Sequence, residues 1–265
     1  DLIELPEQPV RRIARITDRW LRVTRSGTLD ASLLQDRPVE ERHHTGWHVT
    51  WAIPRDLVDS PAEALPPAEG VVYAPTPTRD ELAWPAVLIA TFPLDAARQH
   101  VAPGELTEEL IAHAARLYAE LLSIIAHEEG GGAATLALLP QGIAASELDA
   151  RLRQTTREVL SGTPLLATAT GQRLPPRHAR AIDGPLGSDP QVLRSLAPLS
   201  GEFVVIPQQV RAVARELGVE FLRPEDVIES IPLTACQPAP LVELYDALAP
   251  YAGEYREVFA LLPVL

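Results

Sequence analysis

The stretch PAVLIATFPLDAARQHVAPGELTEELIAHAARLYAELL, residues 85–122, decides the fold expected for this chain. It begins with a continuous apolar run at residues 86–92, which Pro93 closes. Such a run is too short for a typical helix and suits a strand covered on both faces. Thr107 is the expected N-cap of the long amphipathic helix that follows. The inward face of that helix repeats at helical spacing through Leu110, Ala114, Leu117, Leu121 and Ile125.

The loop between this strand and this helix carries several polar residues. Residues 93–104 hold Asp95, Arg98, Gln99 and His100 between two prolines and a glycine. An arginine three residues after an aspartate fits a local ion pair. An arginine on such a loop also fits a second role, in which it supplies positive charge to a phosphoryl-transfer site built by another domain. Composition does not choose between these two interpretations.

Upstream of residue 85 the sequence favours β structure. Residues 12–17 and 20–24 alternate apolar and polar side chains around a short turn, which is typical of a hairpin. Residues 47–53 alternate with period two, and residues 70–74 form a further short strand. The segments expected as loops are residues 54–69 and 75–84. A sheet of such strands with one helix on its face makes a compact α+β unit, and α+β is the expected fold class.

A glycine-rich break at residues 128–133 separates this unit from a second half that reads as α/β or mostly helical. Ser146 is the expected N-cap of a helix that runs to about Leu160. Asp189 followed by Pro190 is typical of a further helix start, with the aspartate as N-cap. Short strands are expected within residues 163–174, around a turn at Gly171, and at residues 203–206.

The composition bounds the function. A chain of 265 residues with 46% apolar composition can bury a substantial core. Its formal charge of −13 argues against binding to nucleic acid or to an anionic membrane. No apolar run approaches the roughly 20 residues of a membrane span. No secretory signal opens the chain, so a cytoplasmic location is expected. The single cysteine, Cys236, excludes an internal disulfide and a multi-cysteine metal site.

Side chains that could carry chemistry do not form a familiar motif. His43, His44 and His48 are the densest histidine group, but no carboxylate or cysteine lies at a metal-ligand spacing, so a solvated strand edge is favoured over a metal site. Cys236 has no placed histidine partner and is expected to be inert. No Walker motif or dinucleotide-binding glycine motif occurs. Serines without a nucleophile-elbow context are Ser60, Ser146, Ser161, Ser195 and Ser200.

The block at residues 92–122 resembles the middle segment of the heat-shock protein 90 class of chaperones. In that class a strand leads into a Leu-Pro-Leu-Asn-x-Ser-Arg-Glu loop and then into a long helix. Residues 92–99, Phe-Pro-Leu-Asp-Ala-Ala-Arg-Gln, occupy that pattern here.

A closer similarity, across nearly the whole chain, is to bacterial sacsin-like proteins. Their N-terminal ATPase domain, of the gyrase–chaperone–histidine-kinase–MutL superfamily, is followed by such a segment. The stretches that carry this similarity are DRPVEERHHTGWHVTWAIP, VVYAPTPTRDELAWPAVLIATFPLD, TPLLATATGQRLPPRHARAID and LVELYDALAP.

This resemblance implies a domain organisation. Residues 1–25 would contain the last strands of an ATP-binding domain whose motifs lie upstream of Asp1. Residues 26–128 would form a transducer-like βαβ middle domain of ribosomal-protein-like fold. Residues 134–265 would form a smaller, largely helical α/β domain that resembles a sacsin repeat.

The resemblance also implies a site. Arg98 matches the family's arginine that reaches the terminal phosphate of ATP in the neighbouring domain. The family's chaperones carry a glutamine four residues later, where this chain has Ala102. Gln99 is the adjacent candidate, but it is expected to point elsewhere. ATP and Mg belong to the parent protein, and no cofactor or metal is expected in this segment itself.

The function implied is that of a middle segment of a sacsin-like chaperone, which couples the ATP state of the upstream domain to a client or partner. Expected partners are that domain, client proteins and a second copy of the chain. Alone, the segment is not expected to hydrolyse ATP. The alternative is a nucleotide-independent protein-interaction module with Arg98 in a structural ion pair. A stand-alone hydrolase is disfavoured because no nucleophile–base pair can be named.

Overall fold

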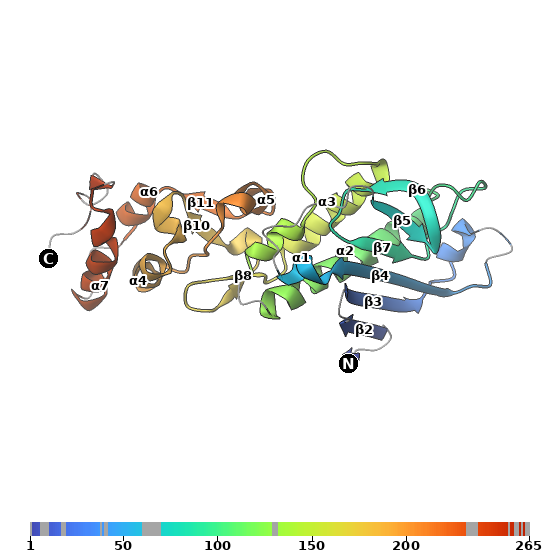
Figure 1. Ribbon diagram of the computed structural model, residues 1–265, viewed down its shortest axis with the longest axis horizontal. Helices are drawn as coiled ribbons and strands as arrows, with labels where there is room; N and C mark the ends of the chain where they lie inside the picture. The colour runs from blue at the N-terminus through green and yellow to red at the C-terminus, as the bar shows by residue number, and fades with distance from the viewer. Residues whose placement is uncertain are drawn as a thin grey trace. The chain divides into compact units, whose positions relative to one another are not determined.

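A computed structural model gives the fold of two compact units, which are coloured along the chain in Figure 1. Unit 1 comprises residues 1–129 and 137–159, and unit 2 comprises residues 130–136 and 160–265. The chain contains both helices and strands, which confirms the α+β class. The structure describes residues 2–5, 11–16, 20–37, 39, 42–59, 70–128, 132–231, 238–253, 255–256, 260 and 262.

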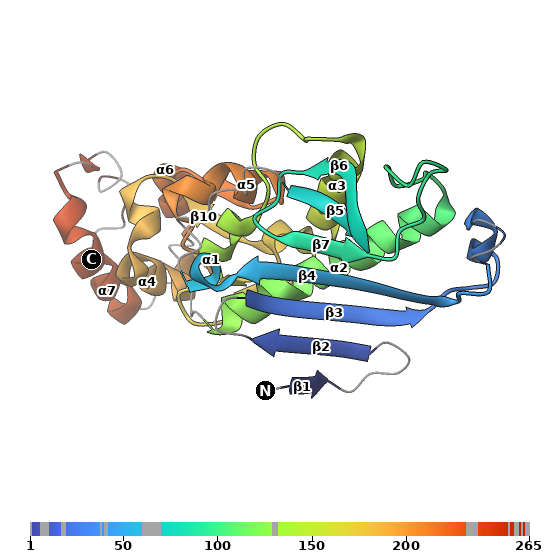
Figure 2. The same ribbon diagram turned by 45° about the vertical axis from the view of Figure 1, so that its right-hand side comes forward.

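Unit 1 is built on a seven-stranded sheet with strand order β1-β2-β3-β4-β7-β5-β6 (Figure 2). Neighbouring strands run antiparallel, except that β5 and β7 are parallel. The expected hairpin and the expected strands at residues 47–53 and 70–74 are confirmed. The strands are β1 Leu2–Leu5, β2 Arg11–Ile16, β3 Trp20–Thr28, β4 Gly46–Pro54, β5 Gly70–Ala74, β6 Thr76–Leu82 and β7 Val87–Ala90.

Two segments expected as loops contain regular structure. Residues 75–84 were expected to be irregular, but β6 forms there as the last strand of the sheet beyond β5. Pro77 is compatible with this position because an edge strand need not offer every N–H group to a neighbour. A short helix, α1 (Arg55–Asp59), begins the other expected loop, and residues 60–69 of that loop lie outside the described residues.

The expected domain boundaries differ from those of the structure. The boundary between residues 25 and 26 falls inside β3, which pairs with β4 from Trp20 to Thr28. All seven strands of the sheet precede helix α2 (Glu105–Glu128). The expected βαβ crossover is therefore not formed within the described residues. Residues 137–159, expected in the second domain, belong to unit 1.

Helix α2 covers one face of the sheet, against which it lies in Figure 2. The predicted inward face is confirmed, because all five of its residues are fully buried. The predicted N-cap is wrong, since α2 already begins at Glu105. Thr107 lies inside the first turn instead, where its hydroxyl donates a hydrogen bond of 2.6 Å to the carbonyl of Ala102.

An aromatic cluster forms the centre of unit 1. The rings of Trp51, Trp84 and Tyr118 lie 4.8–5.1 Å apart, and all three side chains are fully buried. Each polar atom of the cluster has a partner: Trp51 donates to the carbonyl of Ala114 at 2.9 Å, and Tyr118 donates to that of Leu138 at 2.6 Å. Burial raises the pKa of the Tyr118 phenol. The cluster joins β4 to α2 by packing and by directed hydrogen bonds.

A buried ion pair attaches helix α3 (Glu147–Ser161) to this cluster. Asp149 and Arg153 are both buried, and their side chains meet in contacts of 2.9 and 3.0 Å. The Trp84 indole donates to the Asp149 carboxylate at 2.7 Å. As predicted, the Ser146 hydroxyl caps the helix, accepting the N–H of Asp149 at 3.1 Å.

His113 on α2 stacks on Trp47, outside the aromatic cluster. Its ring lies 3.8 Å from that of Trp47, with an interplanar angle of 20°, and Nε2 lies 3.2 Å from the Glu109 carboxylate. Burial lowers the pKa of His113 and outweighs the neighbouring Glu109, which acts to raise it. The folded state therefore favours the neutral ring.

The free energy of unfolding of unit 1 is expected to decrease as the pH is lowered, in part because of His113. Because the pKa of His113 is lower in the folded state, its contribution to stability is fully present above the pKa of an unfolded histidine. That contribution is lost as the pH falls from the unfolded pKa toward the folded one. His113→Gln is expected to reduce the loss of unfolding free energy between about pH 7 and about pH 5. Urea unfolding followed by tryptophan fluorescence measures this, since all four tryptophans lie in unit 1. Exposed His44→Gln is the control, and equal pH slopes in all three proteins would contradict the assignment.

Unit 2 combines short helices with two small sheets. Its helices are α4 Pro190–Ser200, α5 Arg211–Glu216, α6 Pro224–Glu229 and α7 Pro238–Leu248. Strands β8 (Leu166–Ala167) and β9 (Arg173–Leu174) are antiparallel, and strands β10 (Arg180–Ile182) and β11 (Glu220–Leu222) are parallel. The 3₁₀ helices of the chain are η1 Leu33–Asp36, η4 Ala134–Leu138, η5 Pro176–His178, η6 Pro185–Ser188, η7 Gln208–Val210 and η8 Ala249–Tyr251.

Local signals in unit 2 are largely confirmed. The Asp189 carboxylate caps α4 by accepting the N–H of Gln191 at 2.8 Å, and Pro190 is the first helical residue. Gly171 lies between β8 and β9 with φ of 92°, a value that favours glycine. The expected strand at residues 203–206 is wrong, since that segment makes only an isolated bridge.

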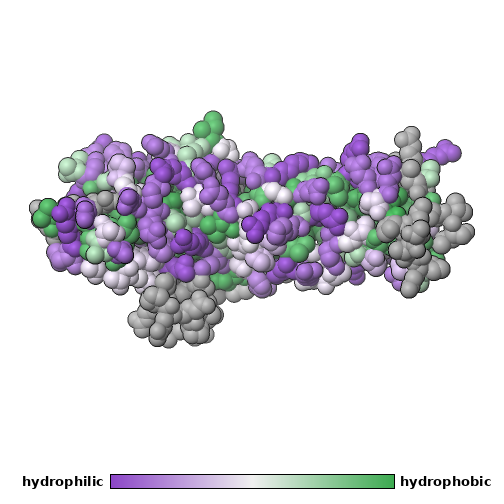
Figure 3. All heavy atoms as spheres, turned by 180° about the vertical axis from the view of Figure 1, so that it is seen from behind, coloured by the Kyte–Doolittle hydropathy of each residue, from purple (hydrophilic) through white to green (hydrophobic). Residues whose placement is uncertain are grey.

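The surface seen in Figure 3 is mostly hydrophilic, and apolar side chains lie in small groups among the polar ones. Among the described helices, none has the length and apolar composition needed to cross a membrane. Large apolar side chains of unit 1 gather instead between α2 and the sheet.

Candidate anion site at the Arg98 loop

The loop that carries Arg98 joins β7 to α2 and begins where parallel strands β5 and β7 end. It is a tight turn, closed by an antiparallel bridge between Leu94 and Val101. The N–H of Asp95 donates to the carbonyl of His100 at 2.9 Å. The loop therefore leaves the sheet at the carboxyl end of β7, beside the end of its parallel neighbour β5.

Asp95 organises the turn through its carboxylate. One oxygen accepts the N–H groups of Gln99 at 2.8 Å and His100 at 3.3 Å. These hydrogen bonds, that of Gln99 first, lower the pKa of Asp95. The carboxylate therefore stays ionised and holds the backbone that follows Arg98.

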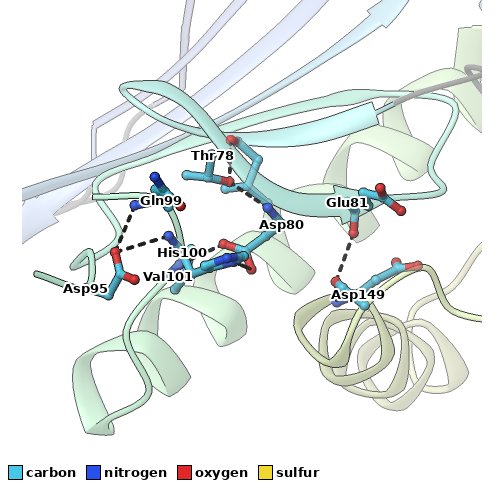
Figure 4. Close-up of polar contacts among 10 residues, drawn as sticks. Thr78, Asp80, Glu81, Asp95, Gln99, His100, Val101 and Asp149 are labelled. Carbon is cyan, nitrogen blue, oxygen red and sulfur yellow. Dashed lines mark hydrogen bonds and ion pairs between the residues drawn. The ribbon is translucent and has the colours of Figure 1, made fainter. Parts of the chain in front are cut away.

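Strand β6 holds the same turn from the other side (Figure 4). The Asp80 carboxylate accepts the N–H of Val101 at 2.7 Å and lies 3.2 Å from Nδ1 of His100. The N–H of Arg79 donates to the carbonyl of Gln99 at 2.8 Å. Two aspartates from different elements thus fix the backbone of a short, exposed loop.

Arg98 itself has an uncommon backbone conformation. Its φ of 54° makes it the one non-glycine residue with positive φ in the part of the chain that the structure describes. This left-handed conformation costs a non-glycine residue about 1 kcal/mol or more, and such residues often accompany functional sites. The hydrogen bonds that the Asp95 and Asp80 carboxylates accept from residues 99–101, directly after Arg98, hold this part of the loop in place.

A pocket of about 660 Å³ lies under the loop, and the exposed side chain of Arg98 lines it. The apolar part of the lining includes Pro75, Phe92 and Leu94. Gln99, the second residue predicted for the site, does not belong to the described lining. It contributes backbone hydrogen bonds to the loop instead.

A second arginine, Arg37, lines the same pocket. It comes from the connector after β3, and only 8% of the residue is exposed. Its Nη2 donates to the carbonyl of Gly46 at 3.4 Å, while Nε has no hydrogen-bond partner among the described residues. Sequence reasoning missed Arg37 because it lies in a charged run that resembles a solvated connector. Nothing in its spacing relates it to Arg98.

The other candidates from the sequence do not form a site. His48 alternates with the tryptophans along β4 and is partly buried, and because β4 lies between β3 and β7 the expected solvated strand edge is wrong. Burial first, and nearby Arg22 second, lower the pKa of His48. The described residues contain no group of three or more His, Cys, Asp or Glu side chains that could hold a metal ion. Cys236 and Ser60 lie outside the described residues. Ser195 is buried and donates to the carbonyl of Gln191 within α4.

Comparison of the chain with protein-family models, with curated proteins and with solved structures finds no match. The class of site is therefore defined by its own chemistry. Two arginines and one hydrogen-bonded carboxylate line a pocket at the ends of two parallel strands. This arrangement suits a small anion.

Proposed function

We propose that this chain is a transducer-like segment of a sacsin-like ATPase or chaperone of the heat-shock protein 90 class. In this proposal Arg98 supplies positive charge to the terminal phosphate of ATP, and an upstream domain of the same protein binds the nucleotide and Mg. The observation that carries the proposal is the strained backbone of Arg98 at a pocket, in a loop whose backbone N–H groups donate to two aspartate carboxylates. Client proteins, a second copy of the chain and a cytoplasmic location belong to the same proposal.

The chemistry of phosphoryl transfer supports this role. Catalysis of that reaction depends mainly on positioning and on stabilisation of negative charge. A positively charged group helps most when its position is fixed before the reaction, because no free energy is then spent on reorganisation. Backbone hydrogen bonds to Asp95 and Asp80 fix the chain from which the Arg98 side chain extends, which supports this role.

Ala102 limits the proposed role of the segment. It stands where the family's chaperones carry a glutamine, and its own N–H donates to the carbonyl of Pro93 at 2.9 Å. A methyl side chain cannot form a hydrogen bond. The proposed contribution is therefore charge from Arg98, without a polar partner four residues later.

Turnover of the protein that joins this chain to its upstream domain tests the proposal. Arg98→Ala is expected to lower kcat for ATP hydrolysis by about 100- to 1,000-fold, because one stabilising group is removed from the transition state. Arg79→Ala, an exposed arginine on β6, is the matched control and is expected to leave kcat unchanged. Steady-state phosphate release measures both variants.

Two results would overturn the proposal. If Arg98→Ala retains full turnover, the arginine has no part in phosphoryl transfer. If the joined protein retains unfolded client equally with ATP, with ADP and without nucleotide, the coupling role fails. The second result would favour the alternative function, a nucleotide-independent interaction module.

A further inference from the structure

We infer that the pocket under the Arg98 loop is itself a binding site for the phosphate group of a small phosphorylated molecule, with Arg37 as its second cationic residue. The site lies wholly within unit 1. It therefore does not require the upstream domain on which the proposed function depends. The inference adds a ligand class and a residue that the sequence did not indicate.

Two arginines from separate segments of the chain line this pocket. Arg37 follows β3 and η1, whereas Arg98 follows β7, so some sixty residues of chain separate them. Both nevertheless line one pocket. Two guanidinium groups that line one pocket can both donate charge-assisted hydrogen bonds to an anion bound in it.

Arg37 is buried, although it carries a charge. With 8% of the residue exposed, its guanidinium has lost most of its contact with water. A buried charge is costly unless it is paired and hydrogen-bonded. The one side-chain hydrogen bond found for it in the described residues joins Nη2 to Gly46 at 3.4 Å. A phosphate oxygen would supply the charge-assisted partner that arginine forks recognise.

The charge balance of the site indicates a compact anion. Among the described lining residues Asp95 is the carboxylate, and one of its oxygens already accepts two backbone N–H groups. These dipoles offset part of its negative charge, so the described lining has more positive than negative charge. The chain as a whole carries −13, which opposes the approach of a long polyanion such as nucleic acid.

The apolar lining and the volume indicate that the phosphate is attached to an organic group. Pro75, Phe92 and Leu94 line the pocket beside the arginines. Its volume of about 660 Å³ lies within the range of small-molecule sites and exceeds what one phosphate group fills. The ligand class is therefore a small phosphorylated organic molecule, for which ATP is the first probe.

Isothermal titration of the 265-residue chain with inorganic phosphate, pyrophosphate and ATP tests the inference. All three probes are expected to bind, and the affinity is expected to fall with ionic strength. Arg98→Gln and Arg37→Gln are each expected to weaken binding at least about tenfold, the effect of losing one charge-assisted hydrogen bond. Arg79→Gln removes the same charge outside the pocket and is expected to change affinity less than about twofold.

Arg37→Lys guards against a folding defect, since it keeps the buried charge but loses the planar fork. It is expected to retain the tryptophan fluorescence of unit 1 and to bind phosphate more weakly than the unchanged chain. No binding of any probe up to about 10 mM would overturn the inference, as would equal losses in the Arg79 and Arg98 variants.

The outcome is separable from that of the proposed function. If Arg98→Gln abolishes phosphate binding by the isolated chain while ATP turnover of the joined protein is unchanged, the pocket is a binding site and the phosphoryl-transfer role fails. If turnover falls while the isolated chain binds no probe, Arg98 serves the upstream site and the present inference fails.

Discussion

Replacement of Asp149 by asparagine is expected to lower the free energy of unfolding of unit 1 by about 3–5 kcal/mol. Asp149 is fully buried and accepts hydrogen bonds from Trp84 at 2.7 Å and from the N–H of Ala145 at 2.8 Å. Its partner Arg153 is 4% exposed and also donates to the carbonyl of Gly142. The substitution leaves the Arg153 charge buried without a counter-ion, and this accounts for most of the expected loss.

Urea unfolding followed by tryptophan fluorescence measures the change. Asp226→Asn is the matched control, because Asp226 pairs with Arg223 at 2.9 Å on the surface. An exposed ion pair contributes far less to stability than a buried one, so this variant is expected to change the free energy of unfolding little. Circular dichroism measures it, because Asp226 lies in unit 2, which contains no tryptophan. The double variant Asp149→Leu with Arg153→Met is expected to be more stable than Asp149→Asn, since no unpaired charge remains. A loss below about 1 kcal/mol for Asp149→Asn would contradict the assigned role of the pair.

Replacement of Trp51 by alanine is expected to cost about 3–5 kcal/mol of the same unfolding free energy. Trp51 is fully buried and touches the rings of Trp84 and Tyr118. Its loss leaves a cavity between β4 and α2 and also frees the carbonyl of Ala114 from its hydrogen bond. Removal of the side chain therefore weakens the contact between sheet and helix.

The remaining tryptophans report this change in urea unfolding. Trp20→Ala is the control, because Trp20 is 40% exposed and its removal is expected to cost well under half as much. Trp51→Phe keeps part of the aromatic contact but loses the indole N–H. Its loss of unfolding free energy is therefore expected to lie between the losses of Trp20→Ala and Trp51→Ala. Equal losses for Trp20→Ala and Trp51→Ala would refute the central position given to Trp51.

Periodic segments of the fold could be predicted from the sequence because their partners are implied by their own pattern. The inward face of α2 repeats every three to four residues, and that face is buried. On β4 the large apolar side chains occupy every second position, and the two tryptophans among them are buried. Helix N-caps could also be predicted, because they depend on neighbouring residues, as at Ser146 and Asp189.

Features that depend on distant contacts could not be predicted. Strand β6 has a polar, proline-containing sequence, and only its pairing with β5 makes it a strand. Nothing in the sequence near Asp149 indicates that its carboxylate takes the N–H of Trp84, 65 residues away. This contact is part of what places α3 in unit 1 and not in the second domain that its position in the chain suggested.

The candidate site shows the same division. Arg98 could be selected because its loop lies between an apolar strand and an amphipathic helix and resembles a family motif. Its strained φ and the clamp by Asp80 could not be foreseen, since they depend on how β6 meets the loop. The place of Arg37 in the pocket could not be predicted for the same reason, because only the folded sheet brings its segment there.

The division of unit 1 into two separate segments has a consequence for any dissection of this protein. The chain leaves unit 1 after Glu129, returns at Ala137 and leaves again after Val159. A piece cut at the glycine-rich break would carry the Arg98 loop but lack the carboxylate that accepts the Trp84 N–H. The shortest stretch from residue 1 that contains all of unit 1 ends at Val159 and necessarily includes residues 130–136 of unit 2. The two units are thus linked by connectivity, and their unfolding transitions are expected to share part of their cooperativity.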